Sequence, residues 1–474
     1  MEGRKPKLGI VFFAARWFEE VVLGNEKTAG LFERFLKEDM ARIVDLLSDT
    51  CQLVICPLVT SMTKAREAVR QLLSDDVDAV LLCFVVWSED EYLLAFQDVM
   101  RIRPTILWAY TPYQRAPEKT DIMTLFRNSG IVATFEVFGL LRRMGIKLFQ
   151  VTGSVLDEKP VNAIRKIARA AMVRSRLRET RLGVLPYRND QMIVTYVDEF
   201  ELYAKIGPSV DYVSVLQLQK ASEGIEPQAV EQLVSWVKSN CSIDTRVSGD
   251  DLQRSARVSL GMESIMEDRG IDGLALSDLN PELHKVLGLR PCLYPESLAR
   301  SNRVVGNEGD LGGTTAMVML QRLTGLPVMF TEIFNYDRET NVVVAGHAGP
   351  ANYLLADESC GITITPDYEL MDATSELSGV WMEFVGKPGR VTMVNCIGVP
   401  EGFQFTVLGG ESLGVNLRIE GYPHCAIRLD PGVEDFIRSN ADHGVSHHWA
   451  VVHDDVQDEV EYLADMLGCP CIGF

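Results

Sequence analysis

The feature that most constrains the fold is a regular alternation of apolar and amphipathic segments in the first third of the chain. The apolar segments that we expect to form strands are residues 7–13, 51–57, 77–86 and 104–109. Continuously apolar strands separated by helical stretches are typical of a parallel sheet covered on both faces. Ligands of such sheets bind beyond the carboxyl ends of the strands, so the loops after Phe13, Val86 and Ala109 are candidate binding regions.

A second series with the same rhythm begins after a change of pattern near residues 153–160. Its expected strands are 181–185, 209–216 and 271–276, and its expected helices are 161–179, 227–239 and 251–267. From about residue 295 the pattern changes again, to short apolar segments separated by turns. These segments are 327–330, 342–345, 361–365, 390–396, 403–408, 416–420 and 425–429, and a helix is expected at 455–467. Such a series indicates an antiparallel sheet or barrel.

The sequence therefore predicts an α/β protein with two doubly wound parallel-sheet domains followed by a β-rich, barrel-like C-terminal domain. The expected boundaries are 1–152, 153–300 and 301–474. A chain of 474 residues is long enough for about three domains at roughly 100–200 residues each.

Charge and hydropathy exclude several classes of protein. A formal net charge of −20 argues against a nucleic-acid partner, because phosphate backbones select basic surfaces. The longest apolar run, near residues 79–87, is shorter than the ~20 residues that span a bilayer. The apolar start lacks a small-residue cleavage site, so we expect a buried first strand there and not a signal peptide. Ten scattered cysteines are typical of reduced thiols in a cytoplasmic protein.

Histidines are unevenly distributed, since six of the seven lie after residue 345. A core histidine held by hydrogen bonds explains any one of them, but their clustering in one region favours a site. Acidic residues accompany them in loop-like positions. Glu308 lies in a glycine-flanked turn before an apolar helix at 314–323, although Asp310 in the same turn could simply cap that helix. Glu332 follows an apolar strand, where a buried carboxylate is costly unless it is paired or bound to metal.

Two imidazoles complete the candidate set. His347 ends the strand 342–345 between small residues, where a plain turn is the alternative explanation. His447 and His448 precede the apolar residues 450–452, and adjacent strand residues face opposite sides, so one of them can point into a site. Two carboxylates and two imidazoles without a thiolate suit a divalent cation. Mn²⁺ fits this mixture best, with Co²⁺, Zn²⁺ or Mg²⁺ as alternatives.

These motifs resemble the L-arabinose isomerase and L-fucose isomerase-like family of aldose–ketose isomerases. Segment 301–317 resembles the family's segment around its first metal-binding glutamate, and 330–336 resembles the strand end that carries the second. Residues 346–347 match the family's Gly-Ser-His element, and 446–448 match its Thr-His-His element. The resemblance implies that Glu308, Glu332, His347 and His448 bind a divalent metal, most simply Mn²⁺. It extends to the helical segment 255–270, whereas the first 150 residues match the family only in their alternation of apolar and amphipathic segments.

The resemblance also implies a reaction. An open-chain sugar is isomerised through an enediol, with Glu308 and Glu332 as the acid–base pair. Met192 is implied as a substrate contact, although core packing is its simpler explanation. His447 is a further candidate for contacting the substrate, and it could instead orient His448 or be a core residue. Relatives assemble into trimers or hexamers in which the first domain caps a neighbour's site, so a homotrimer or homohexamer is expected.

Two departures from the family concern the substrate. Arg16 and Trp17 stand where the arabinose branch has a Gln-His pair, and Ile333 replaces an aspartate. Because arginine matches the geometry of carboxylate, phosphate or sulfonate groups, Arg16 suggests an anionic sugar, with a surface salt bridge as the alternative. Two other functions stay open: a sugar-binding or regulatory protein without catalysis, and a metal-dependent hydrolase in which Asp310 serves as the base.

Overall fold

The computed structural model describes residues 4–16, 29–371, 379–414 and 419–474. The chain forms two compact units, one ending at Ser175 and the other comprising Arg176–Phe474. Within the described residues, no helix is both long enough and apolar enough to cross a membrane. All ten cysteines are free thiols.

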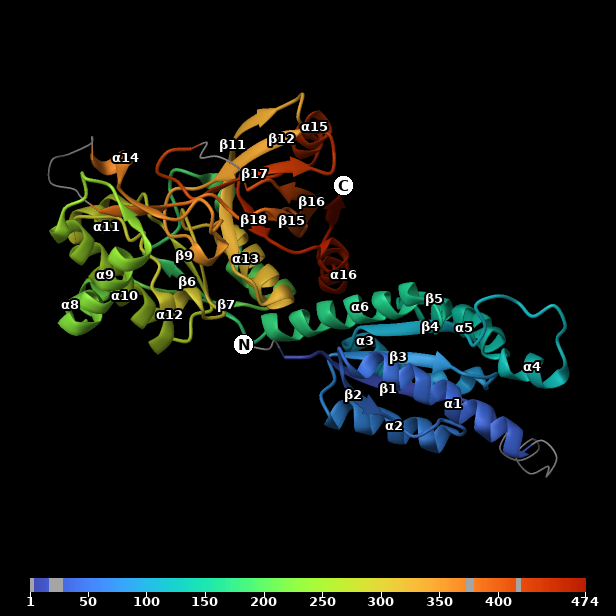
Figure 1. The fold of residues 1–474 in the computed structure, drawn as a ribbon. Helices are drawn as coiled ribbons and strands as arrows, with labels where there is room; N and C mark the ends of the chain where they lie inside the picture. Colours follow the sequence, from blue (N-terminus) through green and yellow to red (C-terminus); the bar gives the residue numbers. More distant parts are fainter. Residues whose placement is uncertain (1–3, 17–28, 372–378, 415–418) are drawn as a thin grey trace. The chain divides into compact units, whose positions relative to one another are not determined.

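The N-terminal unit is a five-stranded parallel sheet with the order β2-β1-β3-β4-β5 (Figure 1). Its strands are β1 (Lys7–Phe13), β2 (Gln52–Ile55), β3 (Ala79–Phe84), β4 (Thr105–Thr111) and β5 (Phe149–Ser154). Its helices are α1 (Ala29–Ser48), α2 (Met62–Ser74), α3 (Gln97–Ile102), α4 (Ile122–Arg127), α5 (Gly130–Met144) and α6 (Glu158–Leu177). The four expected strands are confirmed, and β1, β3 and β4 are almost fully buried, as the apolar strands of a parallel sheet covered on both faces are. The edge strand β5 was not predicted, since its burial is only partial.

The second unit begins with a four-stranded parallel sheet of order β10-β9-β6-β7. Its strands are β6 (Arg181–Leu185), β7 (Ser209–Tyr212), β9 (Gly273–Leu276) and β10 (Val304–Gly306). Its helices are α8 (Val215–Glu223), α9 (Pro227–Asn240), α10 (Gly249–Asp268), α11 (Pro281–Leu287) and α12 (Glu296–Ala299). The strand expected at 209–216 ends at Tyr212, because Ser214 and Gln217 form a capping box that starts α8.

The C-terminal region contains a closed antiparallel barrel. Its six strands are β11 (Val328–Asp337), β12 (Val342–Gly346), β15 (Gly389–Val399), β16 (Gly402–Ser412), β17 (His424–Leu429) and β18 (Trp449–Val452). They run in the order β15-β18-β11-β12-β17-β16, and pairing of β15 with β16 closes the ring. The parallel strand β19 (Cys471–Gly473) adds to β16. The predicted barrel-like fold is confirmed, whereas the segment expected at 416–420 lies mostly outside the described residues.

Three further elements complete this region. A small sheet has the order β14-β13-β8, with β8 at Ser242–Ile243, β13 at Thr363–Pro366 and β14 at Val380–Glu383. The short helix α14 is Tyr368–Met371, and the helices α15 (Val433–His443) and α16 (Gln457–Leu467) follow the barrel strands β17 and β18. Arg176–Phe474 forms one compact unit, so the division of the chain into three domains stays a prediction. The capping role of the first domain also stays a prediction.

One helix joins the second parallel sheet to the barrel. Helix α13 (Leu311–Thr324) contacts β9 and β10 of the sheet and β11, β15 and β18 of the barrel (Figure 1). Twelve of its fourteen residues are buried, which explains why its sequence is apolar on every side. The start of α13 therefore lies where the carboxyl end of β10 meets the barrel.

Candidate metal centre

The turn between β10 and α13 places the first candidate ligand. Glu308 has a left-handed backbone with a φ of 56°, and its N–H donates to Oδ1 of Asp278 at 2.9 Å. Asp278 follows the neighbouring strand β9, so both carboxylates lie at the carboxyl edge of the parallel sheet. Gly309, with a φ of 65°, is packed so closely that a Cβ there would lie 3.1 Å from the main-chain nitrogen of Asn189. The turn thus requires a glycine directly after Glu308.

The barrel supplies the other three candidates from neighbouring strands. Glu332 lies in β11 opposite Gly346 of β12, and His347 follows directly after β12. A Cβ on Gly346 would lie 2.7 Å from the carbonyl oxygen of Pro423, so glycine allows the close approach of the two chains. His448 directly precedes β18, which pairs with β11 next to Glu332.

The fold brings these side chains together in two groups that share His448. Glu332, His347 and His448 each offer one ligand atom within 4.8 Å of the others, and so do Glu308, His447 and His448. Nε2 of His448 lies 3.0 Å from Oε2 of Glu308, and Nε2 of His347 lies 4.0 Å from Oε1 of Glu308. The buried Nε2 of His347 has no hydrogen-bond partner among the described residues. A buried ring nitrogen without a partner, facing two carboxylates, fits a bound cation.

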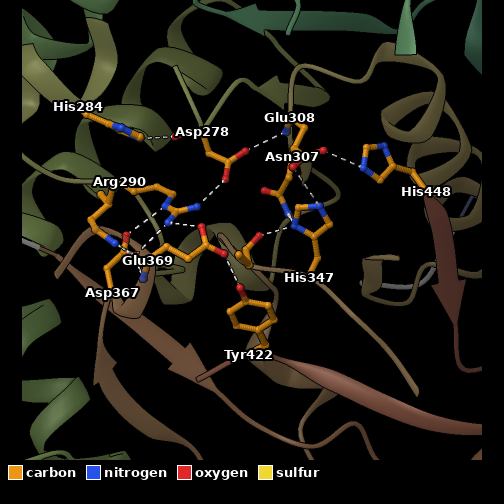
Figure 2. Close-up of polar contacts among 12 residues, drawn as sticks. Asp278, His284, Arg290, Asn307, Glu308, His347, Asp367, Glu369, Tyr422 and His448 are labelled. Carbon is orange, nitrogen blue, oxygen red and sulfur yellow. Dashed lines mark hydrogen bonds and ion pairs between the residues drawn. The ribbon is translucent and has the colours of Figure 1, made fainter. Parts of the chain in front are cut away.

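Each imidazole is held through its other ring nitrogen by an oxygen acceptor. Nδ1 of His448 contacts Oδ2 of Asp310 at 2.8 Å, and Nδ1 of His347 contacts the carbonyl oxygen of Ala348 at 2.5 Å. Nδ2 of Asn307, in the Glu308 turn, lies 3.2 Å from the same nitrogen of His347 (Figure 2). Asp310 also caps α13, because its Oδ1 accepts the N–H of Gly313 at 3.0 Å. Such contacts are the usual means of orienting a metal-binding imidazole. The capping role considered for Asp310 is confirmed, and its contact with His448 comes in addition.

The interactions within the cluster favour the charged forms of Glu308 and His448, although both side chains are buried. Burial opposes ionisation of Glu308, but the hydrogen bonds to His447 and His448 outweigh it and lower the pKa of Glu308. Burial also opposes protonation of His448, but Asp310 and Glu308 raise its pKa to about 9. The carboxylates thus hold a positive charge at this position, which is what a cation site requires.

The expected substrate contacts have different surroundings. Nε2 of His447 lies 3.9 Å from Oε2 of Glu308, and its ring centroid is 3.9 Å from that of His448. Met192 is half-buried and follows the loop that packs on Gly309. Arg16 belongs to the N-terminal unit, where it is exposed and its main-chain N–H donates to Glu89 at 3.4 Å.

A buried network next to the cluster could not be predicted from the sequence. Arg290 is buried and binds the carboxylates of Asp278, Asp367 and Glu369, and Glu369 accepts the hydroxyl of Tyr422 (Figure 2). Charged residues scattered over several loops resemble surface residues, and no local pattern distinguishes these.

Two α/β sheets, a closed barrel and a buried carboxylate–imidazole cluster at a sheet's carboxyl edge define a candidate metal-dependent enzyme. No protein-family model matches the chain. The sulfoquinovose isomerase of Priestia aryabhattai is 23% identical over 90% of this chain and 92% of the relative. That of Alkalicoccus urumqiensis is 24% identical, covering 86% of this chain and 88% of the relative.

A second group of relatives has a related activity. The L-arabinose isomerase of Clostridium beijerinckii is 22% identical over 59% of this chain and 57% of the relative. A solute-binding protein structure from Burkholderia multivorans covers 60% of this chain and 83% of its own at 13% identity, and its TM-score of 0.18 is too low to bear on the fold. These comparisons confirm the predicted resemblance, since the chain is similar over 90% of its length to a sugar isomerase and over a shorter stretch to L-arabinose isomerases.

Proposed function

We propose that the chain is a metal-dependent aldose–ketose isomerase that acts on an open-chain sugar through an enediol. The observation that carries the proposal is the convergence of Glu308, Glu332, His347 and His448 in two adjoining groups that share His448, with Glu332 in β11 and the others next to the ends of β10, β12 and β18. These four side chains would hold the cation, with Mn²⁺ as the best match to the mixture of oxygen and imidazole donors. When bound, the cation would polarise the carbonyl of the sugar and offset the negative charge that develops on its oxygen.

The two glutamates are suited to the proton transfers. In the forward direction one carboxylate removes the proton from C2 of the aldose while O1 gains a proton, which gives the enediol. Loss of the proton from O2 and return of a proton to C1 then give the ketose. Glu308 is buried, whereas Glu332 is half-buried and thus more accessible to a substrate. Burial of Glu308 and its contacts with three imidazoles keep its carboxylate in one place, which is the positioning that general acid–base catalysis needs.

An anionic sugar is the substrate class that we propose. The relatives that cover most of this chain are named for sulfoquinovose, a hexose that carries a sulfonate group. Arg16 is one candidate for holding such a group. Arg188 is another, because its main chain packs on Gly309 and its exposed guanidinium lies 4.4 Å from the ring centroid of Tyr196. No ion pair of Arg188 exists among the described residues, so its charge is available to a ligand.

A neutral aldose is the second candidate, and it is supported by the similarity to L-arabinose isomerases. A hydrolase is less well supported, because both carboxylate oxygens of Asp310 are engaged, one by Gly313 and the other by His448. A hydrolytic base needs an oxygen that is free to accept a proton from water. A sugar-binding protein without catalytic activity does not require a buried cluster of carboxylates and imidazoles.

The test is turnover of an aldose panel by the Mn²⁺-loaded protein. The panel includes sulfoquinovose, an acidic hexose such as glucuronate, and neutral pentoses and hexoses, with ketose formation as the readout. We expect a ketose product from sulfoquinovose with kcat/KM well above that for the neutral sugars. Preferential turnover of L-arabinose would support the neutral alternative, and labelled oxygen from water in a cleaved product would support a hydrolase.

A further inference from the structure

We propose that Glu369 and Tyr422 form a recognition pair for a sugar hydroxyl group, and that buried Arg290 orients this pair. The inference rests on the proposed function, since it assigns a binding role at the same site. It adds two residues that lie outside the four candidate metal ligands and the three candidate substrate contacts.

The pair lies beside the candidate metal centre. Tyr422 precedes Pro423, whose carbonyl oxygen accepts the N–H of His347 at 3.3 Å. The ring of Tyr422 lies 5.6 Å, centroid to centroid, from that of Phe334, two residues after Glu332 in β11. Burial opposes ionisation of Glu369, but Arg290 and the hydrogen bond from Tyr422 outweigh it and lower the pKa of Glu369, and the nearby His347 adds to this lowering. Burial, Glu369 and Glu332 all raise the pKa of Tyr422, so it keeps its proton at neutral pH.

Arg290 fixes the carboxylate of this pair. Its guanidinium donates to Asp367 at 2.9 and 3.0 Å, to Glu369 at 2.8 Å and to Asp278 at 3.3 Å, and it lies 5.2 Å from the ring centroid of Trp381. Burial of a guanidinium with three carboxylates contributes little net stability compared with apolar residues of similar size. The network is therefore better explained by a positioning role, in which Arg290 fixes the places of the surrounding carboxylates.

Only one end of this network reaches solvent. The side chains of Arg290, Asp278 and Asp367 are at most 1% exposed, whereas that of Glu369 is 40% exposed. Asp278 connects the buried end to the N–H of Glu308 (Figure 2). The same charged group thus positions the backbone of a candidate metal ligand on one side and the Glu369–Tyr422 pair on the other.

The chemistry of the pair matches a hydroxyl donor. One oxygen of Glu369 is held by Arg290, and the other accepts the hydroxyl of Tyr422. The remaining lone pairs of the carboxylate and of the phenol oxygen accept hydrogen bonds but cannot donate them. A hydroxyl of an open-chain sugar supplies the missing donor, and a site built around such a bond rejects analogues that lack the hydroxyl.

The experiment compares Tyr422→Phe with Tyr336→Phe, an exposed tyrosine of β11. The readouts are KM and kcat for the aldose turned over, Mn²⁺ content, and calorimetric binding of two alditols that cannot isomerise: reduced sulfoquinovose and L-arabinitol. We expect Tyr422→Phe to raise KM and the alditol Kd about 10-fold, which is the value of one hydrogen bond. Its kcat should change less than 3-fold and its Mn²⁺ content should not change. Tyr336→Phe should resemble the wild type. Glu369→Gln, measured in the same way, should weaken alditol binding at least as much.

The outcomes separate this inference from the proposed function. Wild-type turnover together with unchanged alditol binding in both Tyr422→Phe and Glu369→Gln overturns the inference and leaves the isomerase intact. A wild-type protein that neither turns over an aldose nor binds an alditol overturns the proposed function and the pair's role with it. Lost Mn²⁺ in Tyr422→Phe would also contradict the inference, because it would show a general disturbance of the site.

Discussion

Oδ2 of Asp310 lies 2.8 Å from Nδ1 of His448, which is 138 residues further along the chain. The other carboxylate oxygen of Asp310 accepts the N–H of Gly313 and so begins α13. One side chain therefore sets the start of the helix that joins sheet and barrel and also orients an imidazole of the candidate metal centre. Glu308, two residues before Asp310, contacts the opposite ring nitrogen of the same imidazole.

Asp310→Ser separates these two roles. Serine also caps helices, so α13 should form, and we expect the free energy of unfolding to change by less than about 1 kcal/mol. Without the carboxylate, His448 loses its orienting partner, and Mn²⁺ affinity should fall roughly 10–100-fold. Calorimetric titration with Mn²⁺ and thermal unfolding of the metal-free protein measure the two effects. Asp121→Ser, at the cap of α4, is the matched control and should leave Mn²⁺ affinity unchanged. Equal Mn²⁺ affinity in all three proteins would show that Asp310 is only a helix cap.

Glu308→Gln tests the acid–base assignment. The amide keeps the shape of the side chain but cannot transfer the proton, so we expect kcat to fall about 10²–10⁴-fold. Initial rates with the best aldose of the panel measure this change, and Mn²⁺ content measured alongside separates lost catalysis from lost metal. Glu339→Gln, an exposed position beyond β11, serves as the control. A near-normal rate in Glu308→Gln would remove Glu308 from the catalytic pair.

The substrate charge is tested by Arg16→Ala and Arg188→Ala. A hydrogen bond to a charged group contributes about 1.5–3 kcal/mol, so loss of the responsible arginine should lower kcat/KM for the anionic sugar roughly 10–100-fold. Neutral aldoses should be turned over at unchanged rates. Arg66→Ala, an exposed arginine of α2, is the control. If neutral and anionic sugars respond alike to both substitutions, neither arginine recognises the anion.

His453 predicts a specific pH dependence of stability. Burial lowers its pKa to about 4, although Nε2 donates to the carbonyl oxygen of Lys387 at 2.7 Å. Because an unfolded histidine titrates near 6.5, the unfolded chain binds the extra proton between pH 6.5 and 4, and stability falls as the pH falls through this window. From pH 6.5 to 5 the wild type should lose on the order of 1–2 kcal/mol more than His453→Gln. Urea unfolding at both pH values measures this difference, and identical losses in the two proteins would contradict it.

Strands that are buried on both faces were predictable from the sequence. β1 and β6 begin and end where their apolar runs do. The short strand β10 was not predicted, because three apolar residues between turns give no periodic signal. That strand matters most for the site, since it places Glu308 at the carboxyl edge of the parallel sheet and beside the barrel.

The candidate site was predictable only as far as motifs mark it. Glu308, Glu332, His347 and His448 stand among glycines and apolar strands, and the fold brings them together. Asp278, Arg290, Glu369 and Tyr422 come from separate loops and from a short helix, and tertiary packing alone brings them together and buries Asp278 and Arg290. For Asp310 the sequence left helix cap and site residue as alternatives, and the structure gives it contacts of both kinds.

The most direct test of the account is metal content together with ketose formation in the wild type and in His448→Ala. His448 belongs to both groups of candidate ligands, so its loss should disrupt each of them. We predict about one Mn²⁺ per wild-type chain and ketose formation from an aldose of the panel, with both lost in His448→Ala. A wild-type protein that binds no divalent metal and isomerises its sugar without one, at a rate unchanged by His448→Ala, would contradict the account.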